Sequence, residues 1–221
     1  IEGTLHFPGF GGGGNWGGAA FDPVSNLLII KSLTVATVHY LIPNEGGALT
    51  PMPDAEGLGI PGDSNAEGLG DPMPGTPYRT DNTEFSSPLG LPCTPPPWGT
   101  LTAIDMDSGS VEWQVPFGIG RRYGITVPKF MEWGSAIIGG PITTAGGLIF
   151  MGGSMDKKFR ALDVETGEEL WSDELPYAGM AVPMSYTAEG KQYVVIAAGG
   201  NRRTFTEEGD AIVAYVLGPG D

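Results

Sequence analysis

Histidine is the side chain that most often acts as a metal ligand or a general base near neutral pH, and this chain has two, His6 and His39. They stand far apart in the sequence, and neither has a cysteine or a pair of carboxylates beside it. A zinc site needs several such ligands together. The spacing of the histidines therefore predicts no metal site.

Carboxylates and arginines form a second set of candidates. Asp105 and Asp163 are candidate acids, but each occupies the same place in a repeated turn, which predicts a structural role. The pairs Arg121-Arg122 and Arg202-Arg203 could meet an anionic substrate or a quinone, yet loop arginines are ordinarily solvated. These residues by themselves identify no catalytic side chain.

A glycine-rich stretch is the third candidate. Residues Phe10 to Gly18 hold six glycines around Asn15 and Trp16. Glycine lets a backbone approach a flat or crowded group closely. The stretch does not resemble a phosphate loop, because no Lys-Ser or Lys-Thr pair and no helical pattern follows it.

The elements that must position these residues are repeated. Residues 103–113 (AIDMDSGSVEW) and 161–171 (ALDVETGEELW) share Ala, Asp, Ser or Thr, Gly and Trp at identical spacing. The aspartate can accept backbone hydrogen bonds and the glycine supplies a positive φ, so each copy predicts a hairpin. Each copy also delivers a tryptophan at the same place, where we expect it to pack against the neighbouring unit. Stacked units of this kind predict a β-propeller of four-stranded blades.

Strands are also expected over residues 4–7, 27–30, 35–42, 99–105, 193–198 and 211–216, and a polar loop over 117–133. Together the strands form about three blades, too few for a ring of about four to eight blades. Residues 43–97 are dominated by Pro, Gly, Asp and Glu. We expect them to form a long surface insertion in a single partial propeller domain spanning residues 1–221.

Composition excludes several classes of function. The chain has 37 glycines and 20 prolines but 40% hydrophobic residues, so it is rich in turns and still able to form a core. The net charge of −15 argues against nucleic acid and anionic membrane surfaces as partners. The sequence contains no run of about 18 apolar residues, so it predicts no transmembrane segment. The sequence begins with Ile1 and shows no signal-like region, so we expect a fragment or a processed product.

Several motifs resemble one enzyme family. Residues 12–23 (GGGNWGGAAFDP) resemble the G-G-x-N-W segment of the pyrroloquinoline quinone (PQQ) dehydrogenases. The resemblance continues through residues 87–93, 97–105, 139–147 and 190–200. The chain resembles the C-terminal third of the membrane-bound glucose, quinate and polyol dehydrogenase branch.

The resemblance implies an all-β fold, an eight-bladed β-propeller whose tryptophan motifs dock blade to blade, with PQQ and calcium at its axis. A carboxylate base would take the substrate hydroxyl proton while hydride passes to the quinone, and calcium would polarise the quinone as a Lewis acid. The base, the calcium carboxylates and a stacking tryptophan belong to earlier blades of the family and have no counterpart in this chain.

Few site residues carry over from the family. The resemblance implies that Asn15 hydrogen-bonds near the quinone oxygens and that Trp16 lies beside it; local turn capping by Asn15 and plain packing by Trp16 are the alternatives. Asn201 stands where glucose dehydrogenases have the histidine of a Gly-Gly-His loop facing the active site, so glucose itself is not implied. Ile138 replaces a tryptophan of the methanol-type enzymes, which favours sugars or polyols.

We therefore expect part of a PQQ- and calcium-dependent dehydrogenase that oxidises sugars or polyols and passes electrons to ubiquinone. The alternative is a non-catalytic PQQ-like propeller that acts as a scaffold or assembly module. The expected partners are the remaining blades, from an upstream segment or a separate chain, and we expect no turnover by this chain alone. The resemblance also implies a periplasmic location, with attachment to the inner membrane through a part outside this chain.

Overall fold

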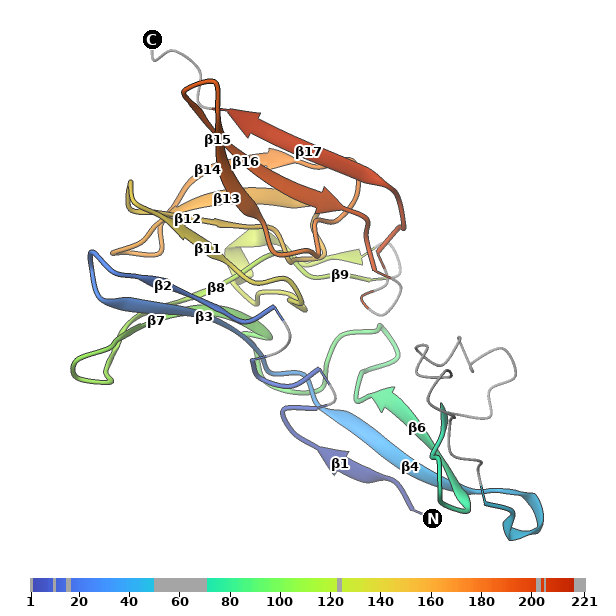
Figure 1. Ribbon diagram of the computed structural model, residues 1–221. Helices are drawn as coiled ribbons and strands as arrows, with labels where there is room; N and C mark the ends of the chain where they lie inside the picture. Colours follow the sequence, from blue (N-terminus) through green and yellow to red (C-terminus); the bar gives the residue numbers. More distant parts are fainter. Residues whose placement is uncertain are drawn as a thin grey trace.

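The computed structural model describes residues 2–9, 11–14, 17–49, 71–122, 125–201, 204 and 206–216. Three antiparallel sheets are fanned beside one another, and a fourth sheet stands apart from them (Figure 1). The fan confirms the predicted partial β-propeller, because the sheets are separate blades and do not close a ring.

The three blades follow one another along the chain. The first blade has the strand order β2 (Ala19–Asp22), β3 (Leu27–Leu33), β7 (Gly99–Asp105) and β8 (Val111–Pro116). The second has the order β11 (Ile142–Thr144), β12 (Leu148–Met151), β13 (Lys158–Asp163) and β14 (Glu169–Glu174). The third consists of β15 (Met184–Ala188), β16 (Lys191–Ala198) and β17 (Ala211–Val216).

The repeated turn forms as its residue types predict. Asp105 Oδ1 accepts a hydrogen bond from the backbone N–H of Ser108 at 2.7 Å, and Asp163 Oδ1 accepts one from Thr166 at 2.9 Å. The glycine that follows has a φ of 74° in the first copy and 73° in the second. Both aspartates therefore hold the hairpin turn, as predicted.

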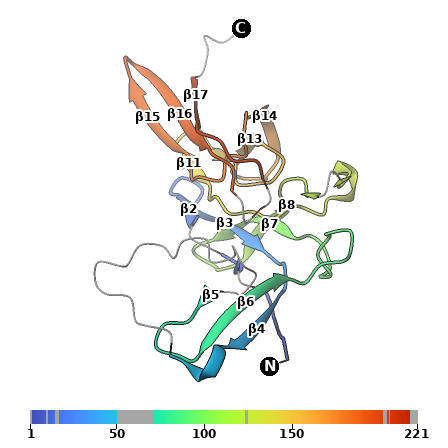
Figure 2. The ribbon, with the colours of Figure 1, turned by 90° about the vertical axis from the view of Figure 1, so that its right-hand side faces the viewer.

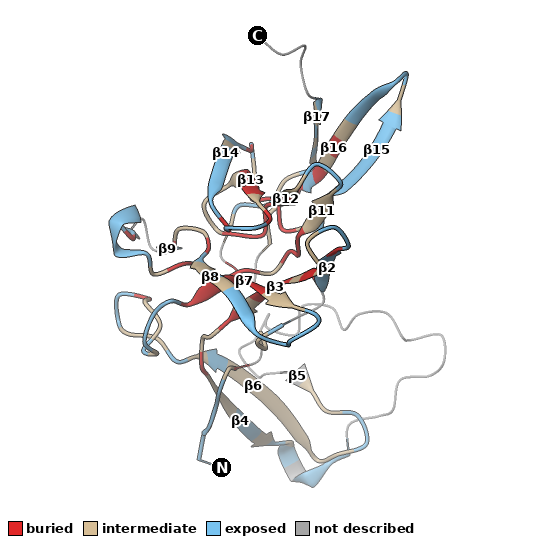
Figure 3. Ribbon diagram, turned by 90° about the vertical axis from the view of Figure 1, so that its left-hand side faces the viewer, coloured by how far each residue is buried: buried red, intermediate tan, exposed pale blue. Residues whose placement is uncertain are grey.

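The apolar cores lie between the blades. Figure 3 shows buried residues concentrated in β3 and β7 of the first blade. The core between the first two blades contains Leu27, Ile29, Leu101, Ala103, Phe117, Ile137, Ile149, Met151, Leu162 and Val164. The core between the second and third contains Phe159, Leu175, Val194, Ile196 and Ala198. Each blade is thus stabilised mainly by its neighbour, as expected for stacked units.

The fourth sheet extends into the segment predicted as a long surface insertion. It has the order β1 (Thr4–His6), β4 (Thr37–Pro43), β6 (Tyr78–Glu84) and β5 (Asp71–Pro72), and it lies below the blades in Figure 2. Strand β6 falls inside the predicted insertion and pairs along the whole of β4. Its sequence, YRTDNTE, lacks an apolar alternation, because β6 has no buried residue on either face.

The segment predicted as a polar loop over residues 117–133 also contains short structure. It holds the two-stranded sheet of β9 (Arg121–Arg122) and β10 (Ile125–Thr126) and the 3-10 turn η3 (Lys129–Met131). Phe117 and Val127 are buried in it, so the segment is partly packed against the blades. A second 3-10 turn, η1 (Glu45–Gly47), follows β4.

Candidate functional site

The tryptophans of the repeat set the spacing of the blades. Trp113 at β8 donates a hydrogen bond from its indole N–H to the carbonyl oxygen of Val164 at 3.0 Å, in the second blade. Trp171 at β14 meets Tyr215 of the third blade edge to face, with ring centroids 5.1 Å apart. The predicted packing of each tryptophan against the neighbouring unit is confirmed.

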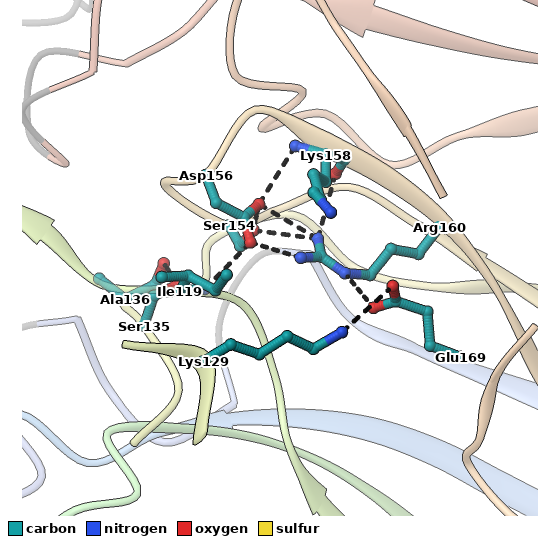
Figure 4. A network of polar contacts seen from close by, with 9 residues as sticks. All are labelled: Ile119, Lys129, Ser135, Ala136, Ser154, Asp156, Lys158, Arg160 and Glu169. Carbon is teal, nitrogen blue, oxygen red and sulfur yellow. Dashed lines mark hydrogen bonds and ion pairs between the residues drawn. The ribbon is translucent and has the colours of Figure 1, made fainter. Parts of the chain in front are cut away.

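A buried ion network also joins the first two blades (Figure 4). Asp156 forms a salt bridge with Arg160, and their side chains are only 8% and 4% exposed. Asp156 Oδ2 also accepts a hydrogen bond from the backbone N–H of Ile119, at the exit of the first blade, at 3.0 Å. Glu169 accepts from Arg160 Nε at 3.0 Å and lies 3.8 Å from Lys129 Nζ. The network crosses from one blade to the next.

The charges in this network hold one another ionised. Burial alone would raise the pKa of the Asp156 carboxyl, but hydrogen bonding and attraction by Arg160 hold that pKa below its ordinary value. Glu169 is shifted in the same direction by Arg160. Arg160 forms one wall of a cleft of about 760 Å³ between the blades, but its guanidinium is occupied by these partners and by the ring of Phe117, 5.1 Å away. The Arg160 network thus links the two blades beside this cleft.

The backbones of all three blades meet at a group of glycines. A β-carbon on Gly17 would stand 2.5 Å from the carbonyl oxygen of Ile138, and one on Gly140 would overlap the backbone of Gly17. On the other side, a β-carbon on Gly139 would stand 2.8 Å from the carbonyl oxygen of Ala181. We call Gly17, Ile138–Gly140 and Met180–Ala181 the inner junction. Gly17 directly follows Asn15-Trp16 in the chain.

A small depression adjoins the inner junction on the third blade. It has a volume of about 230 Å³ and is lined by Met180, Ala181, Ala197, Gly199, Gly200 and Asn201. This volume is below the roughly 300 Å³ of a typical small-molecule pocket, and its lining is apolar apart from Asn201. The depression has the character of one wall of a larger site.

Two threonines hold the backbone of Asn201. The Asn201 N–H donates to Thr206 Oγ1 at 2.8 Å, and the Asn201 carbonyl oxygen accepts from Thr204 Oγ1 at 3.0 Å. Thr204 is 5% exposed, so this loop is anchored in the protein. Asn201 is thereby kept at the edge of the depression.

The structure tests only some of the predicted site residues. Asn15 and Trp16, predicted to contact the cofactor, lie outside the described residues, as do Arg202 and Arg203. Asn201 is described and lies near the inner junction through Met180 and Ala181, which line the same depression. The predicted cofactor contacts of all three residues remain predictions.

Pairing of β1 with β4 brings the two histidines together although the sequence separates them. The rings of His6 and His39 meet edge to face, with centroids 4.9 Å apart, and His39 Nε2 lies 2.9 Å from Thr37 Oγ1. Across the described part of the chain, no three His, Cys, Asp or Glu side chains gather closely enough to hold a metal ion. Nothing in these residues therefore provides the acidic ligands of a calcium site.

Sequence reasoning missed the inner junction as a unit and the buried Lys31 beside it. Gly139 and Gly140 stand within the motifs of the resemblance, but their contact with Gly17 joins residues more than a hundred positions apart. The signal for Lys31 was a single lysine inside the apolar run LLIIKSL of β3. A lone charge in a run of that kind indicates either an exposed edge or a special buried position.

Comparison with known proteins agrees with this architecture. Residues 1–194 match the family model described as PQQ, glucose/ethanol/alcohol dehydrogenase, beta-propeller domain. The chain is 40% identical to the quinate/shikimate dehydrogenase (quinone) of Acinetobacter baylyi, over 97% of this chain and 26% of that protein. It is also 40% identical to the glycerol dehydrogenase large subunit of Gluconobacter thailandicus, over 96% of this chain and 30% of that protein. The chain thus spans less than a third of the length of these curated relatives.

A solved structure supports the fold. The quinohemoprotein alcohol dehydrogenase of Comamonas testosteroni superimposes with a TM-score of 0.59 over 96% of this chain and 28% of that chain, at 22% identity. Among the residues that the structure describes, no helix has the length and apolar character needed to span a membrane.

Proposed function

This chain belongs to the glucose/ethanol/alcohol dehydrogenase family of PQQ β-propellers, and we propose that it supplies three blades of a PQQ-dependent dehydrogenase acting on sugars or polyols. The relatives named for quinate, shikimate and glycerol support a polyhydroxylated substrate. Their names also support an enzyme over a non-catalytic scaffold.

The inner junction is the observation that carries this proposal. Three glycines, Gly17, Gly139 and Gly140, let the backbones of the three blades pack directly against one another. Gly17 follows the Asn15-Trp16 motif in the sequence, so this packing supports the segment that the family motif assigns to the cofactor. The arrangement therefore fits a PQQ site beside the junction, where bound PQQ would supply the hydride acceptor.

In this proposal the chain orients the reactants and does not perform the proton transfer. Asn15, two residues before Gly17, hydrogen-bonds near the quinone oxygens, and Trp16 lies beside it. Asn201, whose backbone is held by Thr204 and Thr206, presents its amide to the cofactor or to a substrate hydroxyl. An amide both donates and accepts hydrogen bonds, as a polyol does, so it can orient such a substrate without changing charge.

The remaining parts of the reaction come from blades outside this chain. The catalytic base and the calcium ligands are assigned there, because the described residues cluster no suitable carboxylates. Ubiquinone is proposed as the electron acceptor, which is supported by the word quinone in a relative's name. A periplasmic location is part of the same proposal, and this chain alone is expected to have no turnover.

The test is reconstitution of this chain with the blades that complete the ring, in the presence of PQQ and calcium. We expect a bound-cofactor absorption spectrum and dye-linked oxidation of glucose, glycerol or quinate. Asn15→Ala should weaken cofactor binding while the protein stays folded, whereas Asn44→Ala, which removes a local bond to the Ala48 carbonyl, should not. Absence of both a cofactor spectrum and activity toward all three substrates contradicts the proposal.

A further inference from the structure

Lys31 is the largest side chain that the first blade buries completely. It lies on β3, on the same face as the buried residues Leu27, Ile29 and Leu33, and it is 0% exposed. Its Nζ donates a hydrogen bond to the carbonyl oxygen of Ile137 at 3.3 Å. Within the described part of the chain this is the one polar contact recorded for the ammonium group.

A buried ammonium group with one hydrogen bond lowers the free energy of unfolding. An ammonium has three N–H donors, and burying it without full pairing is unfavourable. Burial lowers the pKa of Lys31 to about 8, so the amine is still mostly protonated at neutral pH. A methionine of similar length would fill the same space without this cost, because replacing buried charge by apolar volume is often stabilising. The fold alone therefore gives no reason for a lysine here.

The place of Lys31 in the blade suggests the reason. Its neighbour Ile30 pairs with Ala19, so Lys31 lies at the end of β3 that is next to the glycine stretch. Its acceptor, Ile137, directly precedes Ile138–Gly140 of the inner junction. That segment is in backbone contact with Gly17. Lys31 thus connects β3 to the segment that supports Gly17 from the second blade.

We propose that Lys31 is a positioning residue of the cofactor site. Its hydrogen bond to Ile137 holds Ile138–Gly140 against Gly17, the residue that follows the Asn15-Trp16 motif in the sequence. Lys31 does not touch substrate or cofactor in this role. The inference rests on the proposed function for the identity of the cofactor, but the tether itself is a property of this chain.

Lys31→Met in the reconstituted holoenzyme separates a positioning role from a structural one. We expect the dissociation constant for PQQ to rise about tenfold, the effect of losing one hydrogen bond from a charged donor. The denaturant midpoint should stay unchanged or rise, since the substitution removes a buried charge. Lys31→Gln keeps a neutral N–H donor, so its dissociation constant for PQQ should lie between those of the wild type and Lys31→Met. Lys191→Met, the same change at an exposed strand position, is the control and should alter neither quantity.

A second measurement needs no cofactor. Amide hydrogen exchange of residues 137–140 in the protein without PQQ should be faster in Lys31→Met than in the wild type, while exchange in β16 should not change. Unchanged exchange in residues 137–140 overturns the tether. Equal PQQ affinity in wild type and Lys31→Met, or loss of folding stability in step with PQQ affinity, overturns the positioning role. A wild type that binds no PQQ contradicts the proposed function instead.

Discussion

A β-carbon on Gly167 would stand 2.7 Å from the ring of Trp113, so the tryptophan of one repeat docks on the glycine of the next. The same glycine has a φ of 73°, as the hairpin turn requires. One residue type therefore serves the turn within a blade and the contact between blades. This double use explains how a short motif can specify both the hairpin and its stacking.

Gly167→Ala and Gly109→Ala separate the two uses. Both glycines have a positive φ, but no atom lies within 4 Å of a β-carbon on Gly109. Each substitution should cost about 1–2 kcal/mol for the left-handed backbone. Gly167→Ala should cost about 1–3 kcal/mol more, because the new methyl group displaces Trp113. Denaturant unfolding of the assembled propeller measures the difference, and equal losses would contradict the docking contact.

Asp156→Asn should destabilise the protein by about 3 kcal/mol at neutral pH, because it removes the buried carboxylate partner of Arg160 and leaves only the more exposed Glu169 to pair with the guanidinium. The pKa of Asp156 is lowered on folding, so its contribution is complete above the unfolded value of about 3.9 and disappears as the pH falls through the folded pKa. The variant should therefore lose less stability than the wild type below about pH 4.

The measurement for this pair is the free energy of unfolding from pH 7 downward in both proteins. Asp107→Asn is the control, since Asp107 is exposed in the neighbouring blade's turn. An acid dependence that is the same in Asp156→Asn and wild type would show that the network does not stabilise the blades.

Gly140→Ala tests the inner junction. Its β-carbon would overlap the backbone of Gly17, so the segments must separate, and PQQ affinity should fall by about tenfold or more. Gly146→Ala is the matched control, because nothing lies within 4 Å of its β-carbon and it requires no positive φ. Isothermal titration of PQQ into the reconstituted protein gives both affinities. Tight binding by Gly140→Ala would remove the junction from the cofactor site.

The parts of the fold that sequence could predict are those with a local pattern. Strands β7 and β17 have the predicted bounds, and the repeat correctly placed Trp113 against the next blade. Strand β6 was missed because its residues are half-buried on both faces and show no apolar alternation. The start of β4 lies at Thr37, two residues after the predicted Val35, since strand ends depend on the partner strand.

The candidate site was harder to predict because its contacts are distant in sequence. Asn201 was predicted through a motif, and its proximity to the inner junction depends on how the third blade packs on the second. No local sequence pattern indicates the buried position of Arg160. Its partner Asp156 is held by a hydrogen bond from the backbone N–H of Ile119, which belongs to another blade. Pairing of residues across blades is a property of the packed propeller and has no local sequence pattern.

Thr206→Val should loosen the loop that carries Asn201. The valine removes the hydroxyl that accepts from the Asn201 N–H at 2.8 Å, so this hydrogen bond is lost. We expect KM for the polyol to rise about threefold to tenfold while kcat changes little, because orientation of the substrate is affected and hydride transfer is not. Thr187→Val, on β15 away from this loop, should behave like the wild type. An unchanged KM would separate Asn201 from substrate binding.

Lys31 should make the protein more stable as the solution becomes alkaline. Its pKa is about 8 in the folded protein and 10.5 in the reference state, so between these values the unfolded chain binds more protons. Stability then rises with pH, and the gain reaches about 3 kcal/mol, since each pKa unit corresponds to about 1.4 kcal/mol. Below about pH 8 both states are protonated and this contribution is flat. Unfolding measured from pH 7 to pH 10.5 should show the rise in wild type relative to Lys31→Met, and parallel curves for the two proteins would show that the amine is not desolvated.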